Sequence, residues 1–425
     1  MQYARAAVFV ALVLFGCDGK PPPIPLDGGQ RDAGPRDAGP SRDAFVPDAD
    51  AAPIQPPDAG APSCTVGPDD VHKVATDRPG DRVIALAAAG DGFGLVFTAL
   101  PEGAASAEVH GVRLSSSGDL GALSAITAPP GRKETPAVGA LGTTWVSAWV
   151  DNDPDTFEVR TRALAVDLTP TGASAAYLTA TPAVGESGPT MLVGSGGALV
   201  AWIADDGTTR SVRAQRVGAD GAPIGASAVS SSGHRFGALA LGELAAGPAL
   251  LYAATEDTPG GPETRVYVQG LTAAGAMRGS AGRVDHEGNA DGTVDAALFP
   301  SGGAVVFGVL VGGVRSEVRF RALDGEGALL GDERILAQGT DASIAAFAGG
   351  YAVSYRASAS PAEIRLLLVS NLGDVVAELP IAQAQVAGGR TTVRVSGDGH
   401  IAIAWADTDT QTAISVARVA CGGGT

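Results

Sequence analysis

Basic residues, aromatic residues and cysteines are all scarce in this sequence. Its 425 residues include 29 lysines and arginines against 46 aspartates and glutamates, a net charge of -17, and only 5% are aromatic. A protein that binds nucleic acid needs a basic surface for the phosphates, so this charge argues against a nucleic-acid partner. Because 45% of the residues are hydrophobic and only 18% charged, a wholly disordered chain is excluded as well.

Long hydrophobic runs are also missing. The apolar stretch near the N-terminus, Ala6 to Phe15, has ten residues, whereas a membrane-spanning helix needs about 20. The stretch follows Arg5 and is closed by Gly16-Cys17, which is the layout of an export signal. Residues 1–16 are therefore predicted to be a signal peptide.

The end of this segment, Leu14-Phe15-Gly16-Cys17, resembles the lipobox of bacterial lipoproteins, although Phe15 departs from the small or aliphatic residue usual there. The resemblance implies that Cys17 becomes the acylated first residue of the mature chain. More than one acyl chain on that cysteine gives stable membrane anchoring. We therefore expect a lipid-anchored protein of the bacterial cell envelope, outside the cytoplasm, with the choice between inner and outer membrane left open.

The segment after the cysteine has almost no large apolar side chains. The 46 residues from Asp18 to Ser63 contain eleven prolines and a tandem five-residue unit, Arg-Asp-Ala-Gly-Pro, at 31–35 and 36–40. Such a composition cannot bury a core, so residues 17–63 are predicted to be the lipidated cysteine followed by a disordered tether.

From residue 83 onward the chain repeats itself. A short hydrophobic run ends in one aromatic residue seven times, at intervals of 52, 53, 50, 55, 48 and 50 residues. The aromatic residues are Phe97, Trp149, Trp202, Tyr252, Phe307, Tyr355 and Trp405. A period near 50 residues indicates a solenoid, a propeller or an array.

Each unit divides into four short strands. A first run such as Pro136-Ala137-Val138 precedes the aromatic run, and a third strand carries alternating arginines, as in Val159 to Ala163. A turn glycine then leads into a fourth strand such as Ala175 to Thr179; this glycine recurs at Gly118, Gly172, Gly221, Gly275, Gly327 and Gly373. Four strands in a unit of this size are typical of propeller blades, whereas an immunoglobulin-like sandwich needs about 100 residues.

The two ends of the chain complete one another. The seventh unit stops after its third strand at Cys421, and Val71 to Ala75 has no unit of its own, so we assign it as the missing fourth strand. Cys64 and Cys421 then lie where other units have a turn, and a disulfide between them is expected in an oxidising compartment. The predicted fold is an all-β, seven-bladed β-propeller over residues 64–421, with a tail at 422–425.

These features resemble those of bacterial exported propellers whose units combine an apolar run, an aromatic residue, an acidic turn, an arginine strand and a glycine turn. The resemblance covers residues 64–421 and implies little about function, because that group largely lacks an assigned activity. The repeated aromatic residues are expected to pack in the blades rather than to form a ligand cage.

No firm catalytic or metal-binding pattern is visible, and no catalytic residue is assigned. Asp151-Asn152-Asp153-Pro154-Asp155 begins like a calcium loop, but the EF-hand's sixth and twelfth positions hold Thr156 and Arg162. A looser calcium site built from Asp151, Asp153, Asp155 and Glu158 stays open, beside the simpler interpretation of a solvated acidic loop.

Charge is concentrated in the loops that join second and third strands. These seven loops hold 15 acids and 4 bases, and in a propeller they emerge on one face. An acidic face favours a cation or a basic protein as partner.

We expect a monomeric, membrane-anchored binding or scaffold module. The alternatives are a hydrolase or lyase acting on polysaccharide or peptide at the tunnel mouth, and a purely structural envelope protein.

Overall fold

The computed structural model describes residues 63–74, 83–100, 106–128, 131–153, 156–172, 175–179, 185–194, 196–232, 235–286, 288–313, 315–358, 362–384, 390–406 and 414–422. The predicted signal peptide, Cys17 and nearly all of the predicted tether lie outside these residues. Within them the chain forms strands and one 3-10 helix, η1 (Pro68–Asp70). No helix in this part of the chain is long and apolar enough to cross a bilayer.

Four sheets have four strands each, and every strand in them pairs antiparallel with its neighbour along the chain. The first two sheets are β3 (Ile84–Ala89), β4 (Gly92–Ala99), β5 (Glu108–Ser115) and β6 (Ser124–Ala125), then β7 (Arg132–Leu141), β8 (Thr144–Asp153), β9 (Thr156–Leu164) and β10 (Ala176–Tyr177). The next two are β11 (Gly185–Gly194), β12 (Gly197–Asp205), β13 (Arg210–Val217) and β14 (Pro223–Ser232), then β15 (Arg235–Leu244), β16 (Gly247–Thr258), β17 (Gly261–Gly270) and β18 (Gly282–Arg283).

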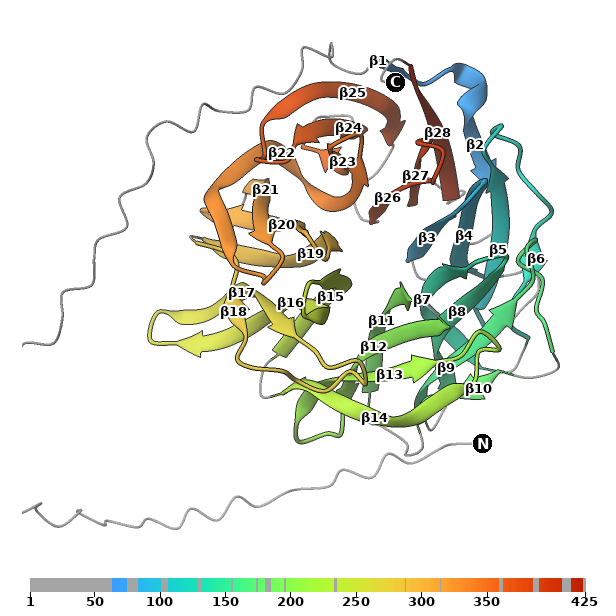
Figure 1. Cartoon of the computed structure of the whole chain (residues 1–425), viewed down its shortest axis with the longest axis horizontal. Coiled ribbons are helices and arrows are strands. Elements are labelled where there is room, and N and C mark those ends of the chain that lie inside the picture. Colours follow the sequence, from blue (N-terminus) through green and yellow to red (C-terminus); the bar gives the residue numbers. More distant parts are fainter. Residues whose placement is uncertain are drawn as a thin grey trace, which may run out of the picture. The chain divides into compact units, whose positions relative to one another are not determined.

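Two larger sheets complete the domain. Seven strands form one of them: β19 (Asn289–Phe299), β20 (Gly302–Val311), β21 (Arg315–Asp324), β22 (Leu329–Phe347), β23 (Gly350–Ala357), β24 (Ala362–Ser370) and β25 (Val375–Ala384). The other joins the two ends of the chain: β26 (Thr391–Val395), β27 (Ile401–Ala406), β28 (Ile414–Gly422), β1 (Ser63–Thr65) and β2 (Val71–Val74). Figure 1 shows the sheets around a common centre, with β3, β7, β11, β15, β19 and β26 nearest to it. The predicted all-β propeller fold is confirmed.

The closure predicted from the chain ends is also confirmed. β2 pairs antiparallel with β28, Val71 opposite Ala417, as the assigned fourth strand requires. β1 pairs with the end of the same strand, Cys64 opposite Cys421, and these two cysteines form a disulfide across 357 residues. The helix η1 separates the two short strands.

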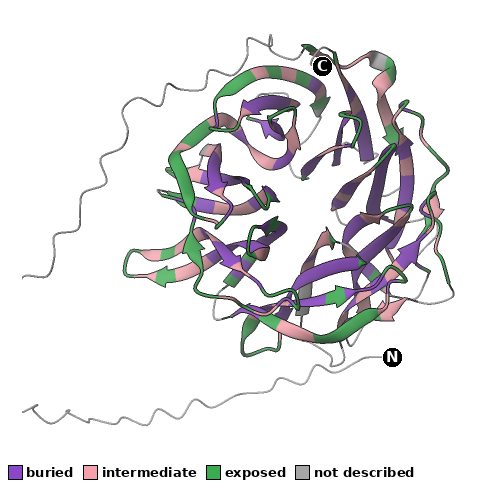
Figure 2. Ribbon diagram, in the orientation of Figure 1, coloured by how far each residue is buried: buried purple, intermediate pink, exposed green. Residues whose placement is uncertain are grey.

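The repeated aromatic residues lie in the second strands, as expected, and all are at most 3% exposed. Their neighbours are aliphatic side chains of two successive sheets: Trp202 of β12 packs with Val146 and Val150 of β8. Buried residues are concentrated in the second strands such as β4 and β12, and exposed ones along the outer strands such as β14 and β25 (Figure 2). The aromatic residues are therefore core residues that join neighbouring sheets.

One predicted turn glycine was misplaced. Five of the six recurring glycines close the turn after the third strand with positive φ; Gly118, for example, has φ 99° and donates its N–H to the carbonyl of Ser115. In the second unit the equivalent hydrogen bond runs from Leu168 to Ala165, and Leu168 itself has φ 66°. Gly172 lies further along. The cost of a left-handed leucine is offset by complete burial of its side chain, which packs over Gly111.

Candidate functional site

A polar cavity of about 340 Å³ lies at the centre of the propeller. Its walls come from the start of β3, the middle of β7, β11, β15 and β19, the second half of β22, and β26. Each inner strand pairs antiparallel with the strand that follows it; Thr340 lies opposite Arg356, for example, just before the loop between β23 and β24. Val83 and Arg390, which line the cavity just before β3 and β26, therefore lie toward the face where the loops between second and third strands emerge.

Asp341 is a charged residue of this wall in an unusual conformation. It has φ 58° at a register shift in β22 between Thr340 and Ser343. Its Oδ2 accepts a hydrogen bond from Thr340 Oγ1 at 2.9 Å and lies 3.7 Å from Nε of Arg356. Burial raises the pKa of the Asp341 carboxyl, with Asp291 adding to the rise, while Thr340, Arg356 and Arg390 oppose it. The protein thus holds a carboxylate in a setting that disfavours its charge.

Thr135 occupies the corresponding place in β7. It has φ 42° at the register shift between Glu134 and Ala137, where β11 and β19 have Gly188 (φ 63°) and Gly292 (φ 90°). Positive φ in a β-branched residue is strained, and such strain concentrates at functional sites. The Oγ1 of Thr135 is buried and has no hydrogen-bond partner among the described residues. Strain at two positions of one ring and an unsatisfied hydroxyl make this wall the candidate site of the propeller.

A second carboxylate in the cavity has its hydrogen bonds satisfied. Asp295 Oδ2 accepts hydrogen bonds from Ser343 Oγ at 2.5 Å and from the backbone N–H of Ile344 at 3.1 Å. Arg394 Nη1 lies 3.4 Å from the same oxygen. Because β19, β22 and β26 supply these groups, the network joins three neighbouring parts of the ring. Its role is structural, and the candidate site consists of Asp341, Thr135 and the exposed Arg390 of the same cavity.

Two of the candidate calcium ligands, Asp151 and Glu158, form ion pairs with basic side chains of the protein. Both oxygens of Asp151 are engaged: Oδ1 lies 2.7 Å from Nζ of Lys133, and Oδ2 lies 2.9 Å from Nε of Arg160. Glu158, opposite Asp151 in the β8–β9 register, contacts the same Arg160 at 3.3 Å. Asp155 and the side chain of Asp153 are not among the parts of the chain that the structure describes. No group of three potential metal ligands lies together among the described residues.

The charge of the acidic loops is partly neutralised by arginines of the third strands. In four units a glutamate near the start of the third strand pairs with the arginine two residues later: Glu158 with Arg160, Glu263 with Arg265, Glu317 with Arg319 and Glu363 with Arg365. Three of the four arginines lie just past the loop boundaries, so the charge counted for the loops includes the glutamates but not these arginines. The net charge of the loops therefore overstates the field on this face.

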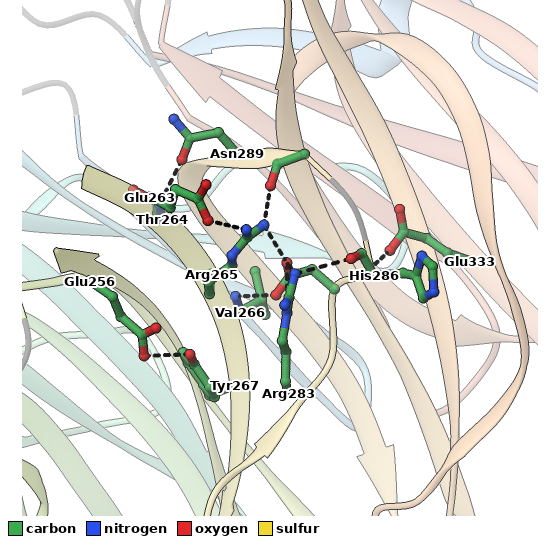
Figure 3. A network of polar contacts seen from close by, with 12 residues as sticks. Glu256, Glu263, Thr264, Arg265, Val266, Tyr267, Arg283, His286, Asn289 and Glu333 are labelled. Atoms are coloured by element: carbon green, nitrogen blue, oxygen red, sulfur yellow. Dashed lines mark hydrogen bonds and ion pairs between the residues drawn. The ribbon is translucent and has the colours of Figure 1, made fainter. Parts of the chain in front are cut away.

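Figure 3 shows the network around one of these pairs, Glu263 and Arg265. Asp285, whose side chain is 1% exposed, contacts Arg265 at 3.4 Å and Arg283 at 2.9 Å, and its Oδ1 accepts the backbone N–H of Val266. The backbone N–H of His286 donates to Glu333 of β22 at 2.8 Å. These contacts fasten the sheet of β15–β18 to the next one, which is a structural task. Sequence reasoning found the arginines but not their partners, although the spacing Glu-x-Arg was visible.

Comparisons with known proteins support the fold alone. No family model matches the chain, and no curated protein matches it. Among solved structures, the WD40 domain of Toxoplasma gondii coronin is 10% identical, with a TM-score of 0.51 over 86% of this chain and 87% of that one. The WD40 repeats of RRP9 are 14% identical, with a TM-score of 0.50 over 84% of this chain and 100% of that one. At these identities the likeness establishes a β-propeller and says nothing of ligand or activity.

Proposed function

We propose that the protein is a seven-bladed propeller, tethered by a lipidated Cys17 in the bacterial envelope, that binds a partner at the central opening of its loop face. The observation that carries the binding role is the cavity wall. It combines a half-buried carboxylate, a buried hydroxyl without a partner among the described residues and backbone strain at two equivalent positions. Strain of this kind persists only where the surrounding fold enforces it, and it is typical of ligand sites.

The number of blades is inferred from β22. Its first part, to Gln338, pairs with β21, and its second part, from Gly339, pairs with β23. One long strand thus serves as the fourth strand of one blade and the first of the next. Division at that point gives two four-stranded blades, and with β1 and β2 completing the last blade the ring has seven.

The partner fits a group that donates hydrogen bonds or carries positive charge. Asp341 Oδ2 is held by Thr340 and Arg356, while no contact within the described residues engages Oδ1. Arg390 at the same opening is exposed and suits an acceptor on the partner. A basic segment of a protein meets both requirements, because a lysine or arginine side chain reaches Asp341 while backbone carbonyls face Arg390.

Site-specific photo-crosslinking tests the binding role. A photoreactive amino acid is placed at Arg390, and at Leu372 as the control, which is 64% exposed in the turn between β24 and β25 on the opposite face. In intact envelopes we expect discrete adducts from position 390 alone. Asp341→Asn should abolish them, and asparagine keeps the backbone because it tolerates positive φ. Equal adducts from both positions, or adducts unchanged by Asp341→Asn, would contradict the proposal.

The anchor makes a separate prediction. Replacing Cys17 with serine removes the acylation site and should move the protein from the membrane fraction to the soluble fraction, because the proposed anchor is the acyl chains on this cysteine. Fractionation of envelopes followed by immunoblotting measures this. Continued membrane association of the variant would show that something other than a lipid holds the protein there.

A further inference from the structure

Lys133 and Asp151 form a buried pair that none of the roles above explains. They lie opposite one another in adjacent strands, β7 and β8, with side chains 4% and 3% exposed and Nζ 2.7 Å from Oδ1. Gly131 covers them so closely that an added Cβ would lie 3.0 Å from both atoms. The ammonium group and the carboxylate are therefore held together in a setting that excludes water.

Glu108 of β5 is a third buried ionisable group at this place. Lys133 donates its backbone N–H to the carbonyl of Ala107, the residue before Glu108. The charges of both Lys133 and Asp151 act on Glu108, and burial raises its pKa. Oε2 accepts a hydrogen bond from Thr127, while Oε1 is buried without a hydrogen-bond partner among the described residues. The free oxygen is thus available to a neighbouring donor or acceptor.

Arg160 makes the two oxygens of Asp151 unequal. Its Nε lies 2.9 Å from Oδ2, the oxygen that does not face Lys133. A guanidinium there draws electron density from the carboxyl carbon and holds Oδ2 in place. The other oxygen, Oδ1, lies against the lysine.

We propose that Lys133 and Asp151 become joined by an amide bond, a covalent crosslink formed by the protein itself. The bond forms between Nζ of Lys133 and Cγ of Asp151, and the bond from Cγ to Oδ1 breaks. The ammonium group gives up two protons, and both end on Oδ1, which leaves as water. No oxidant, reductant or co-reactant is needed, and Oδ2 remains as the amide oxygen facing Arg160.

The geometry suits this reaction for three reasons. Reacting groups are activated when their atoms are held about 3–3.5 Å apart, and a nitrogen in hydrogen-bond contact with Oδ1 is close to that distance from Cγ. Glu108 is 3% exposed and has one carboxyl oxygen without a hydrogen-bond partner among the described residues, so it is placed to pass a proton from the attacking nitrogen to the departing oxygen. The product also replaces two buried charges, which are costly to desolvate, by a neutral amide.

The crosslink would leave the charges near it balanced. Arg160 keeps Glu158 as its ionic partner at 3.3 Å after Asp151 becomes an amide. The bond would fasten the first two strands of this blade permanently and, unlike the disulfide of Cys64 and Cys421, would resist reduction. For an exported protein this is a second covalent fastening of the fold.

Peptide mass spectrometry of the purified full-length protein tests the proposal. Trypsin cleaves after Arg132, Lys133 and Arg160, with no other site between them. A free Lys133 therefore yields peptide 134–160 at its full mass. An amide at Lys133 blocks the second cleavage, so we expect peptide 133–160, lighter by one water molecule. Recovery of peptide 134–160 at full mass as the main product would overturn the proposal.

Variants separate the crosslink from other losses of water. Glu108→Gln keeps the acceptor for Thr127 but cannot carry a proton, so it should restore peptide 134–160 at full mass. Lys133→Arg should also remove the loss of water, whereas Lys73→Arg, at an exposed lysine, should leave it unchanged. Loss of water that persists in Lys133→Arg would place the dehydration elsewhere and overturn the proposal. The wild-type peptide decides the question even where a variant folds poorly.

Discussion

Replacing both Cys64 and Cys421 with serine should lower the free energy of unfolding by about 2–5 kcal/mol, the usual range for loss of a native disulfide. The bond closes 357 residues, so its loss frees almost the whole domain in the unfolded state. It also releases β1, a three-residue strand, which leaves β2 to hold the last sheet closed.

Thermal unfolding of the full-length protein followed by circular dichroism measures the effect, as a large fall in melting temperature. Cys17→Ser is the matched control, because it removes the third cysteine without touching the bridge. Reduction of the wild-type protein should reproduce the fall seen in the double variant. A double variant that melts with the wild type would mean that strand pairing alone closes the ring.

Replacing Trp202 with alanine should lower the free energy of unfolding by about 3–5 kcal/mol. The indole is fully buried between the sheets of β8 and β12, in contact with Val146 and Val150, and alanine would leave a cavity there. Trp202→Phe should cost much less. Tyr252 and Phe307 show that smaller rings serve at the equivalent position, and the indole N–H is buried without a hydrogen-bond partner among the described residues.

Chemical denaturation measures the free energy of unfolding of both variants, provided that the m-value stays constant. As a control, Leu372→Ala, at an exposed turn, should keep this free energy within about 0.5 kcal/mol of the wild type. If Trp202→Ala and Trp202→Phe destabilised the protein equally, the particular shape of the indole rather than the presence of an aromatic ring would be the important feature. The packing role of the seven aromatic residues would then need revision.

Much of the architecture is readable from the chain because it repeats local rules. Alternating polar and apolar residues with glycine turns every few residues predict four-stranded units. The second strands lie at the repeated aromatic residues, and β2 lies within the segment assigned to it, Val71 to Ala75. The closure could be inferred for the same reason: one unit lacked a strand, and two cysteines stood at the gap.

The sequence-based assignment was wrong where a residue other than glycine adopts the turn conformation. In the second unit Leu168 occupies the turn position, whereas the prediction had placed Gly172, four residues later, there. The sequence around Leu168 gives no sign of a positive φ. The conformational cost of that φ is offset by packing against Gly111, which belongs to another sheet. The same holds for Thr135 and Asp341, whose strain follows from how β7 and β22 reach the centre.

The sequence by itself determined the repeat, the strand order within each unit and the pairing of Cys64 with Cys421, since these depend on neighbours along the chain or on counting units. The tertiary structure alone decided what each charge meets. Asp151, a calcium candidate in the sequence, lies against Lys133, and the acidic loops lie against arginines of the third strands. Electrostatic environment depends on distances between side chains that only folding brings together, so neither the central cavity nor the buried lysine pair could be inferred from composition or spacing.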